Sequence, residues 1–405
     1  MMNFFFHTIF FIALIFEAIL AIYLLIPLFS LLAYGFVNLF KIKSPFERRV
    51  FLDNKNYDFG IIITAHQETK FVIPLVDSII KQTYSNFFIY VIADDCDPAS
   101  LKFDNEQIIV LKPLRALHSK IKSIHYGFAH FIRKHDAVII LDADNLIHPS
   151  FLDVMNNHFR KGYRVVQAQF KPKNIDSNYA RMDAIGDIFN FFIEREIRMR
   201  LNLSATIWGS GVAIDRELYE NIEYKDSLGG FDKKLQAHLV QRVDRIGFAP
   251  DAILFDEKIS SGASLENQRT RWISSYFKYF KESFKIFVNG IKKADFNLIY
   301  FGFITLRPPL FIVLGCAFLF TIINYFINSY YFYSWLIVLF SFLFSFVAIV
   351  IIKGKDSRFI QTLFIIPVFA LRQTVALLKI KKAKKSFLKT QHSKLVFIDD
   401  LIETK

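Results

Sequence analysis

The sequence predicts a mostly parallel α/β sheet with flanking helices, joined to transmembrane and interfacial α-helices. Between about residues 59 and 257, short runs rich in β-branched and aromatic residues alternate with helical patterns, which favours parallel strands connected by helices. Outside that segment lie apolar runs long enough to cross a bilayer. The chain of 405 residues is 53% hydrophobic and 17% aromatic, with 48 Phe. This composition is typical of a membrane protein.

The first element is an apolar stretch over residues 4–40. It has neither a basic leading region nor a small-residue cleavage site, so we interpret it as a retained anchor and not a signal peptide. No polar loop divides the stretch, which predicts one long helix containing Pro27. Four basic residues between positions 41 and 49 follow it, and positive charge favours the cytoplasmic side. Residues 1–43 are therefore the predicted transmembrane anchor, and residues 44–271 a cytoplasmic α/β domain.

The α/β domain is predicted to contain six strands, at residues 60–64, 87–93, 107–111, 137–141, 164–170 and 206–214. Polar clusters follow three of these strands: His66-Gln67-Glu68, Asp94-Asp95 and Asp142-Ala143-Asp144. Ligands of parallel sheets bind beyond the carboxyl ends of the strands. We therefore expect these clusters to line one binding site.

Membrane helices are predicted after the α/β domain. Residues 272–294 place aromatic side chains at helical spacing with lysines between them, which predicts an interfacial amphipathic helix. Residues 309–327 and 331–352 carry no charge and are long enough to span a bilayer. They predict a transmembrane hairpin within residues 295–352, with its outer turn near Asn328-Ser329.

The end of the chain is less regular. Gln361, Pro367 and Arg372 interrupt the apolar run at residues 359–380, and lysines follow it. A span here would place these lysines outside the cell, against the usual charge distribution. We therefore interpret residues 353–405 as an interfacial or re-entrant helix with a basic cytoplasmic tail.

The net charge of +13 suggests an acidic partner. The basic residues lie beside the apolar runs and no nucleic-acid motif accompanies them, so we expect contact with membrane lipids and no nucleic-acid binding. Cys96 and Cys316 are the two cysteines. They predict no disulfide framework.

Asp142 and Asp144 are candidate metal ligands. Their i, i+2 spacing at a strand end places both side chains on one face, where two carboxylates can hold Mg²⁺ or Mn²⁺ against a diphosphate. A solvated turn after the strand is the alternative. Further along, residues 268–272 read QRTRW. On a helix, Gln268 and Arg271 share a face and can engage one diphosphate together, whereas a basic turn with Trp at the headgroup level is the alternative.

The ordered series Asp94-Asp95, Asp142-Ala143-Asp144 and QRTRW resembles that of the family 2 inverting glycosyltransferases. The similarity is to their membrane-integrated group, the cellulose, chitin, hyaluronan and poly-N-acetylglucosamine synthases, and covers about residues 58–293. It implies a GT-A fold, so that residues 44–271 would be a cytoplasmic GT-A catalytic domain at the inner (cytoplasmic) cell membrane. It also implies metal-dependent formation of β-linkages in a polysaccharide or glycolipid from a nucleotide-sugar, UDP-linked, with a glycan or lipid-linked acceptor.

The resemblance also implies roles for individual residues. Asp144 would bind the metal and Asp142 would lie nearer the nucleotide. Lys120, in the segment SKIKSIH that replaces the family's Gly-Lys-x-x-Ala-Leu-Asn, would reach the diphosphate. The TAHQE segment replaces the usual Pro-x-x-Asn-Glu, and a plain turn there is the alternative. The implied nucleotide-sugar site consists of Thr64, His66, Glu68, Asp94, Asp95, Lys120, Asp142, Gln268 and Arg271.

Asp232 is the expected general base, since the family has a Glu-Asp pair before a Leu where this chain has Phe231-Asp232. Its alternative role is a helix N-cap. Trp272, Gly209 and Ser210 would bind the acceptor. About three spans are fewer than polymerising members carry, so export or polymerase subunits are possible partners. The Phe231 departure also motivates a second hypothesis, a non-catalytic membrane scaffold that binds nucleotide or polysaccharide.

Overall fold

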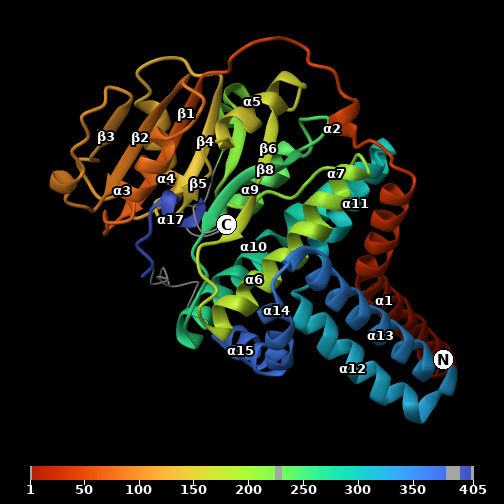
Figure 1. Ribbon diagram of the computed structural model, residues 1–405. Coiled ribbons are helices and arrows are strands. Elements are labelled where there is room, and N and C mark those ends of the chain that lie inside the picture. The colour runs from red at the N-terminus through yellow and green to blue at the C-terminus, as the bar shows by residue number, and fades with distance from the viewer. Residues whose placement is uncertain (1, 224–229, 380–392, 403–405) are drawn as a thin grey trace.

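The computed structural model describes residues 2–223, 230–379 and 393–402. Figure 1 shows a sheet domain with short helices around its strands and a bundle of long helices extending from it. The N-terminus lies at the far end of the bundle, whereas the described C-terminal residues return to the sheet domain. The fold is a mixed α/β sheet of the GT-A type with flanking helices and several apolar helices, as the sequence predicts.

The sheet has the strand order β3-β2-β1-β4-β7-β6-β8-β5 in the described residues. One half is parallel, formed by β1 (Phe59–His66), β2 (Phe87–Asp94), β3 (Ile108–Leu111) and β4 (Ala137–Asp142). The other half contains β5 (Leu146–Ile147), β6 (Val165–Pro172), β7 (Val212–Asp215) and β8 (Gly247–Asp256). There β6 and β8 are parallel, and the β4–β7, β6–β7 and β5–β8 pairs are antiparallel.

Differences from the predicted strands fall in this mixed half. The strand predicted at residues 206–214 is confined to β7, and neither β5 nor β8 was predicted. β8 has a register shift against β6, and Pro250 and Asp251 within it are exposed. A bulge with a proline interrupts the alternation by which a strand is recognised.

The sheet domain buries its strands beneath helices and loops. Ile61, Ile89 and Ile140, on the three central parallel strands, are fully buried. The short elements around them are α2 (Pro45–Arg48), α3 (Val72–Ile80), η1 (Pro98–Ser100), α4 (Lys120–Ala129), α5 (Phe151–Arg160), α8 (Arg216–Glu220) and α9 (Phe231–Leu239). Continuous apolar strands with both faces covered are what a parallel sheet requires.

A broken helix joins the two regions. It consists of α6 (Asn178–Phe191), one π-helical turn η2 (Phe192–Glu196) and α7 (Ile197–Arg200). Phe189, Phe192 and Ile193 pack with residues of the bundle in one cluster. This connection was not predicted from the sequence.

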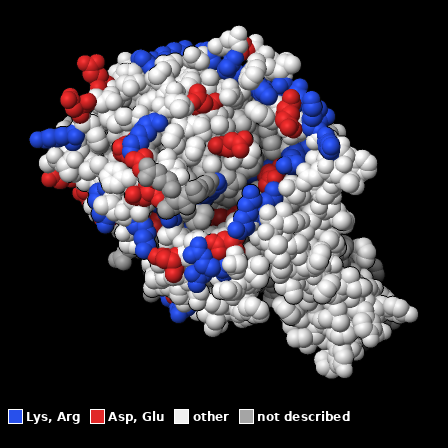
Figure 2. Space-filling model, viewed as in Figure 1, with Lys and Arg blue, Asp and Glu red and all other residues white. Residues whose placement is uncertain are grey.

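The bundle contains α1 (Met2–Leu39), α11 (Phe296–Leu306), α12 (Leu310–Ile327) and α13 (Ser329–Gly354). The single long first helix and the hairpin of α12 and α13 are as predicted, and Asn328 caps α13 by accepting from the backbone N–H of Tyr330 at 2.9 Å. Within the described residues, four helices are long and apolar enough to cross a membrane: 11–39, 310–327, 329–354 and 357–378. On the face in Figure 2, charged side chains gather on the sheet domain and leave the bundle end uncharged.

α10 (Gly262–Lys293) begins ten residues before the predicted interfacial helix and therefore contains QRTRW. Against it lies α15 (Ile366–Leu378), preceded by α14 (Ser357–Thr362) and η3 (Leu363–Ile365). Arg372 Nη1 contacts the buried Glu266 of α10 at 2.6 Å. The lysines at 381–385 lie outside the described residues. The last element is α17 (Ile398–Ile402), whose Ile398 packs on Leu146 and Phe255 beside β5.

Candidate active site

The ends of β1, β2 and β4 form one polar edge of the sheet, called here the carboxyl edge. In the register of the parallel strands, Thr64 lies beside Asp142 and His66 lies beside Asp94. The alignment places the three predicted polar clusters next to one another. Because the strands are parallel, a one-residue shift in register would separate them.

Asp142 ends β4 and forms an ion pair with Lys120, the first residue of α4. The Lys120 ammonium also donates to the Gly209 carbonyl at 2.7 Å and lies 4.9 Å from the centre of the Phe231 ring. A Cβ atom on Gly209 would come within 3.0 Å of that ring. Glycine at this position therefore permits the close approach of three separate segments.

The turn after Asp142 is held by two side chains. The backbone N–H of Asp142 is 3.0 Å from both Asn145 Oδ1 and Ser210 Oγ, and the Ser210 hydroxyl lies 2.5 Å from Asn145 Oδ1. Ser210 and Asn145 are buried. Ser210 therefore holds the backbone of the turn that carries Asp142.

Asp144 is half-buried two residues beyond Asp142, and its carbonyl accepts from the Lys173 ammonium. Burial lowers the pKa of Lys173, while the Asp144 and Asp256 carboxylates oppose the shift. The two carboxylates of the turn offer the oxygen ligands that hard divalent cations prefer. Lys120 balances the charge of Asp142, so these side chains fit a Mg²⁺ or Mn²⁺ ion that binds together with a diphosphate.

Asp232 lies in the first turn of α9, half-buried. The N-cap of this helix is Gly230, with φ +68°, so the alternative prediction that Asp232 is the cap is wrong. Phe231 replaces the Glu of the family pattern, and its ring lies against the Lys120 ammonium. This contact brings the start of α9 to the carboxyl edge, which the sequence could not show.

Gln268 and Arg271 lie on α10, whose first part packs near the same edge. Burial lowers the pKa of Arg271, and the nearby Asp142 carboxylate opposes this shift. The buried Oε1 atom of Gln268 has no hydrogen-bond partner among the described residues. The pair thus offers a guanidinium and an amide to a bound polar group.

Trp272 is 44% exposed and rests on Arg269, whose guanidinium carbon lies 4.2 Å from the indole centre. Arg269 is itself held by the buried Asp183 of α6 at 2.5 Å. The indole face is thereby fixed by a cation that a second helix positions.

Sequence reasoning missed a buried polar chain behind the carboxyl edge. Asn145 contacts Asp256 at 3.4 Å, Asp256 contacts the buried Lys258 at 2.8 Å, and Lys258 pairs with Asp187 of α6. Burial raises the pKa of Asp187 to about 6, although Lys258 opposes the shift. The residues of this polar chain come from three separate segments of the sequence and therefore form no recognisable motif.

Arg195 was also missed. It lies in the π-helical turn, fully buried, with its guanidinium 4.3 Å from the ring centre of Phe191 and 4.4 Å from that of Trp208. Burial lowers its pKa to about 10, and Glu194 opposes the shift. π-helical turns of this kind occur often at functional sites.

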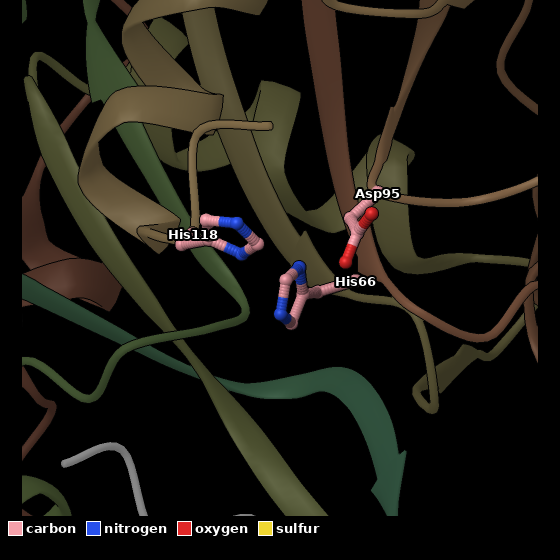
Figure 3. Close-up of side chains that lie close together, drawn as sticks. All are labelled: His66, Asp95 and His118. Atoms are coloured by element: carbon pink, nitrogen blue, oxygen red, sulfur yellow. The ribbon is translucent and has the colours of Figure 1, made fainter. Parts of the chain in front are cut away.

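The loops beyond β1 and β2 carry the other predicted nucleotide-binding residues. The buried Asp94 carboxylate accepts the backbone N–H groups of Leu117 at 2.6 Å and His118 at 2.9 Å, so it organises the loop before α4. Glu68 pairs with Lys70 at 2.7 Å and lines a pocket of about 370 Å³. Figure 3 shows His66, Asp95 and His118 facing one another across a small gap.

Comparisons with known proteins concern the fold and the family of the chain. The mannosyltransferase PcManGT from Pyrobaculum calidifontis, solved with GDP-Man and Mn²⁺, is 15% identical, with a TM-score of 0.56 over 89% of this chain and 97% of that one. S. aureus TarS (residues 1–349), solved with UDP-GlcNAc, is 15% identical, with a TM-score of 0.39 over 56% of this chain and 66% of that one. No curated protein matches by sequence. The model of the family described as glycosyltransferase like family 2 matches residues 56–275, more than half of the chain, and the protein therefore belongs to that family.

Proposed function

We propose that the protein is a membrane-bound, divalent-metal-dependent inverting glycosyltransferase. It transfers a sugar from a UDP-linked donor to a glycan or lipid-linked acceptor at the cytoplasmic membrane face and forms a β-linkage. The observation that carries the proposal is the convergence of Lys120, Asp142 and the start of α9 at one edge of the sheet. This edge belongs to a domain attached to helices that can span a bilayer.

The donor diphosphate would bind between Lys120 and Arg271. Lys120 forms an ion pair with Asp142, and Arg271 is near enough to this carboxylate for its pKa to respond, so a diphosphate would meet two positive groups there. Asp142 and Asp144 would hold the divalent ion, which supplies positive charge against the leaving diphosphate. Thr64, His66, Glu68, Asp94 and Asp95 lie on or beside β1 and β2, where the base and ribose would extend.

Asp232 would accept the proton of the attacking acceptor hydroxyl. One direct displacement inverts the anomeric centre, so an α-linked donor yields a β-linked product. The indole of Trp272, fixed on Arg269, provides a flat apolar face for the acceptor ring. Gly209 and Ser210 would form the floor beneath that ring.

The position of Trp272 suggests where the acceptor comes from. The same helix, α10, exposes Phe277, Phe280 and Phe284, each more than 40% accessible. An apolar surface of this kind favours the headgroup region of a bilayer. An acceptor that is lipid-linked would therefore meet the site along α10.

The donor assay tests this function. Detergent-purified protein is incubated with UDP-glucose, UDP-N-acetylglucosamine or GDP-mannose and Mg²⁺ or Mn²⁺, and nucleotide release is measured. We expect release from one UDP-linked donor, and loss of that release in Arg271→Met. Arg115→Met, at an exposed position, is the matched control. Release from GDP-mannose alone would correct the donor class, and release from none would favour the scaffold hypothesis.

The membrane orientation needs its own experiment. With Cys96 and Cys316 replaced, Ser329→Cys, in the exposed turn of the hairpin, should react with an impermeant thiol reagent on intact cells. Lys112→Cys, exposed on the sheet domain, should react only after lysis. Labelling of position 112 from outside would contradict the cytoplasmic placement.

A further inference from the structure

Three side chains outside the Asp142 turn form a second cluster, called here the His–Asp cluster. His66 ends β1, Asp95 directly follows β2, and His118 precedes α4. One ligand atom of each lies within 4.8 Å of those of the other two. Figure 3 shows ring nitrogens of both histidines and the Asp95 carboxylate directed toward a common gap.

Neighbouring groups orient the members of the His–Asp cluster. Gln67 Nε2 donates to Asp95 Oδ2 at 3.0 Å, and the two imidazole rings meet edge to face with their centres 5.3 Å apart. The buried Asp94 carboxylate lies 3.2 Å from His66 Nδ1 and 2.9 Å from the backbone N of His118. Carboxylates that contact a histidine from behind are a usual feature of metal sites, because they fix the ring and raise its basicity.

The backbone at the cluster is unusual. Gln67, Asp95 and His118 have φ of 59°, 54° and 47°, the left-handed region that residues other than glycine rarely adopt. Asp95 and His118 belong to the His–Asp cluster, whereas Gln67 directly follows its third member, His66, and donates to Asp95. A ligand that links the loops would offset part of the cost of this conformation.

We propose that His66, Asp95 and His118 bind a transition-metal dication, with Zn²⁺ as the best match, at a site separate from Asp142 and Asp144. Two imidazoles and one carboxylate suit Zn²⁺ and its neighbours in the transition series, whereas Mg²⁺ prefers oxygen ligands alone. Bonds of about 2.1 Å require the side chains to move inward by roughly 1 Å. Rotation of the exposed Asp95 and His118 side chains toward the half-buried His66 permits this movement. Three protein ligands leave a fourth position for water or a donor atom of a bound molecule.

The site is tested by zinc binding to the full-length protein in detergent. The Asp142→Asn, Asp144→Asn double variant removes the carboxylates of the other site, and chelator treatment followed by calorimetric titration gives the zinc stoichiometry. We expect one Zn²⁺ per chain, undisturbed by millimolar Mg²⁺. Co²⁺ in place of Zn²⁺ should give the visible absorption of a four-coordinate site.

His118→Asn is the decisive variant, because asparagine tolerates the left-handed backbone while the imidazole is lost. We expect zinc affinity to fall at least about tenfold, comparable to the loss of a supporting group around a metal. His130→Asn, an exposed histidine at the end of α4, should bind zinc unchanged. If His118→Asn proves poorly folded by thermal unfolding, His66→Gln takes its place with the same expected loss.

Two results would overturn the proposal. One is that the double variant binds no zinc. The other is that His118→Asn and His66→Gln bind zinc as tightly as the double variant does. These measurements read metal content and not turnover. Because His66 and Asp95 are also placed in the proposed nucleotide site, a bound zinc would replace their contacts with the base and ribose. Failure of the zinc site leaves the proposed roles of Asp142, Asp144 and Asp232 untouched, and failure of transfer leaves the zinc site untouched.

Discussion

The sheet domain and the helix bundle use the same apolar residues in opposite ways. Ile61 and Ile140 of the sheet are fully buried, whereas Phe326 and Phe340 of the bundle are 79% and 71% exposed. Removal of apolar surface from water stabilises a fold, and the sheet domain achieves this by packing its apolar side chains inside the protein. The bundle leaves such side chains exposed. A lipid bilayer is the environment that its uncharged, exposed surface fits.

The two regions also treat carboxylates differently. In the bundle, Glu17 accepts from Trp335 Nε1 at 2.6 Å and from Asn324 Nδ2 at 3.0 Å, so this single carboxylate ties α1 to α12 and α13. At the carboxyl edge, Asp142 is half-buried like Glu17 but pairs with the Lys120 ammonium, and Asp144 is half-buried two residues beyond it. The Glu17 carboxylate thus joins apolar helices through neutral donors, whereas Asp142 lies against a cation. We propose that the bundle anchors the protein and that the sheet edge carries the chemistry.

The largest expected effect is a loss of turnover without a loss of membrane attachment. Asp144→Ala should lower turnover by about 10²–10³-fold, because the diphosphate loses its charge stabilisation. The amount of protein in the membrane fraction should not change. Asp104→Ala, at an exposed loop position, is the control. Undiminished turnover in excess EDTA would contradict the metal assignment.

The second-largest effect is expected on stability, where a core residue and an exposed bundle residue should differ. Ile140→Ala, in the fully buried strand β4, should lower the free energy of unfolding by about 2–5 kcal/mol. Phe340→Ala, on the exposed face of α13, should lower it by less than about 1 kcal/mol in detergent. Thermal unfolding of the purified variants measures both values. Equal losses would mean that Phe340 packs against protein.

Acid should weaken the sheet domain through His158, which lies in α5 and stacks on Phe46 with ring centres 4.1 Å apart. Burial lowers the pKa of His158 to about 4. The folded protein therefore favours the neutral ring, and stability is lost as pH falls from about 6.5 toward 4, by about 1–3 kcal/mol. In His158→Phe the midpoint temperature should depend less on pH over this range. An unchanged slope would show that other groups cause the acid sensitivity.

The smallest effect is expected inside the bundle. Trp335→Phe keeps an aromatic side chain, although a smaller one, and removes the donor to Glu17, and hydrogen bonds between membrane helices contribute about 1 kcal/mol. Tyr333→Phe, at a position 61% exposed, is the matched control. Unfolding in mixed detergent compares the two variants. If both behave alike, the Glu17 contact does not stabilise the bundle.

The sequence predicted those features that depend on local pattern. The ends of β1, β2 and β4 were recognisable because acidic clusters follow continuous apolar strands, and the hairpin turn at Asn328 because a polar pair separates two uncharged runs. The GT-A expectation came from the order of these motifs, which the match over residues 56–275 confirms.

Features that depend on distant residues could not be predicted. The Phe231 ring meets Lys120 only because α9 and α4 reach the same edge, and Asn145 meets Asp256 only through the β5–β8 pairing. Nothing in the local sequence distinguishes Arg195 from the charged residues beside it, and its burial against the rings of Phe191 and Trp208 depends on tertiary packing. Tertiary packing, which local propensity does not encode, decides each of these contacts.

Asp232→Asn distinguishes the proposed general base at the carboxyl edge from a residue that only begins α9. Nucleotide binding is measured by calorimetry and transfer by product formation, on the same purified variant. We expect transfer to fall by about 10²–10⁴-fold while nucleotide binding stays within a few-fold, because the base acts on the acceptor alone. Near-normal transfer by the variant would contradict the account, because the proton would then leave through another group.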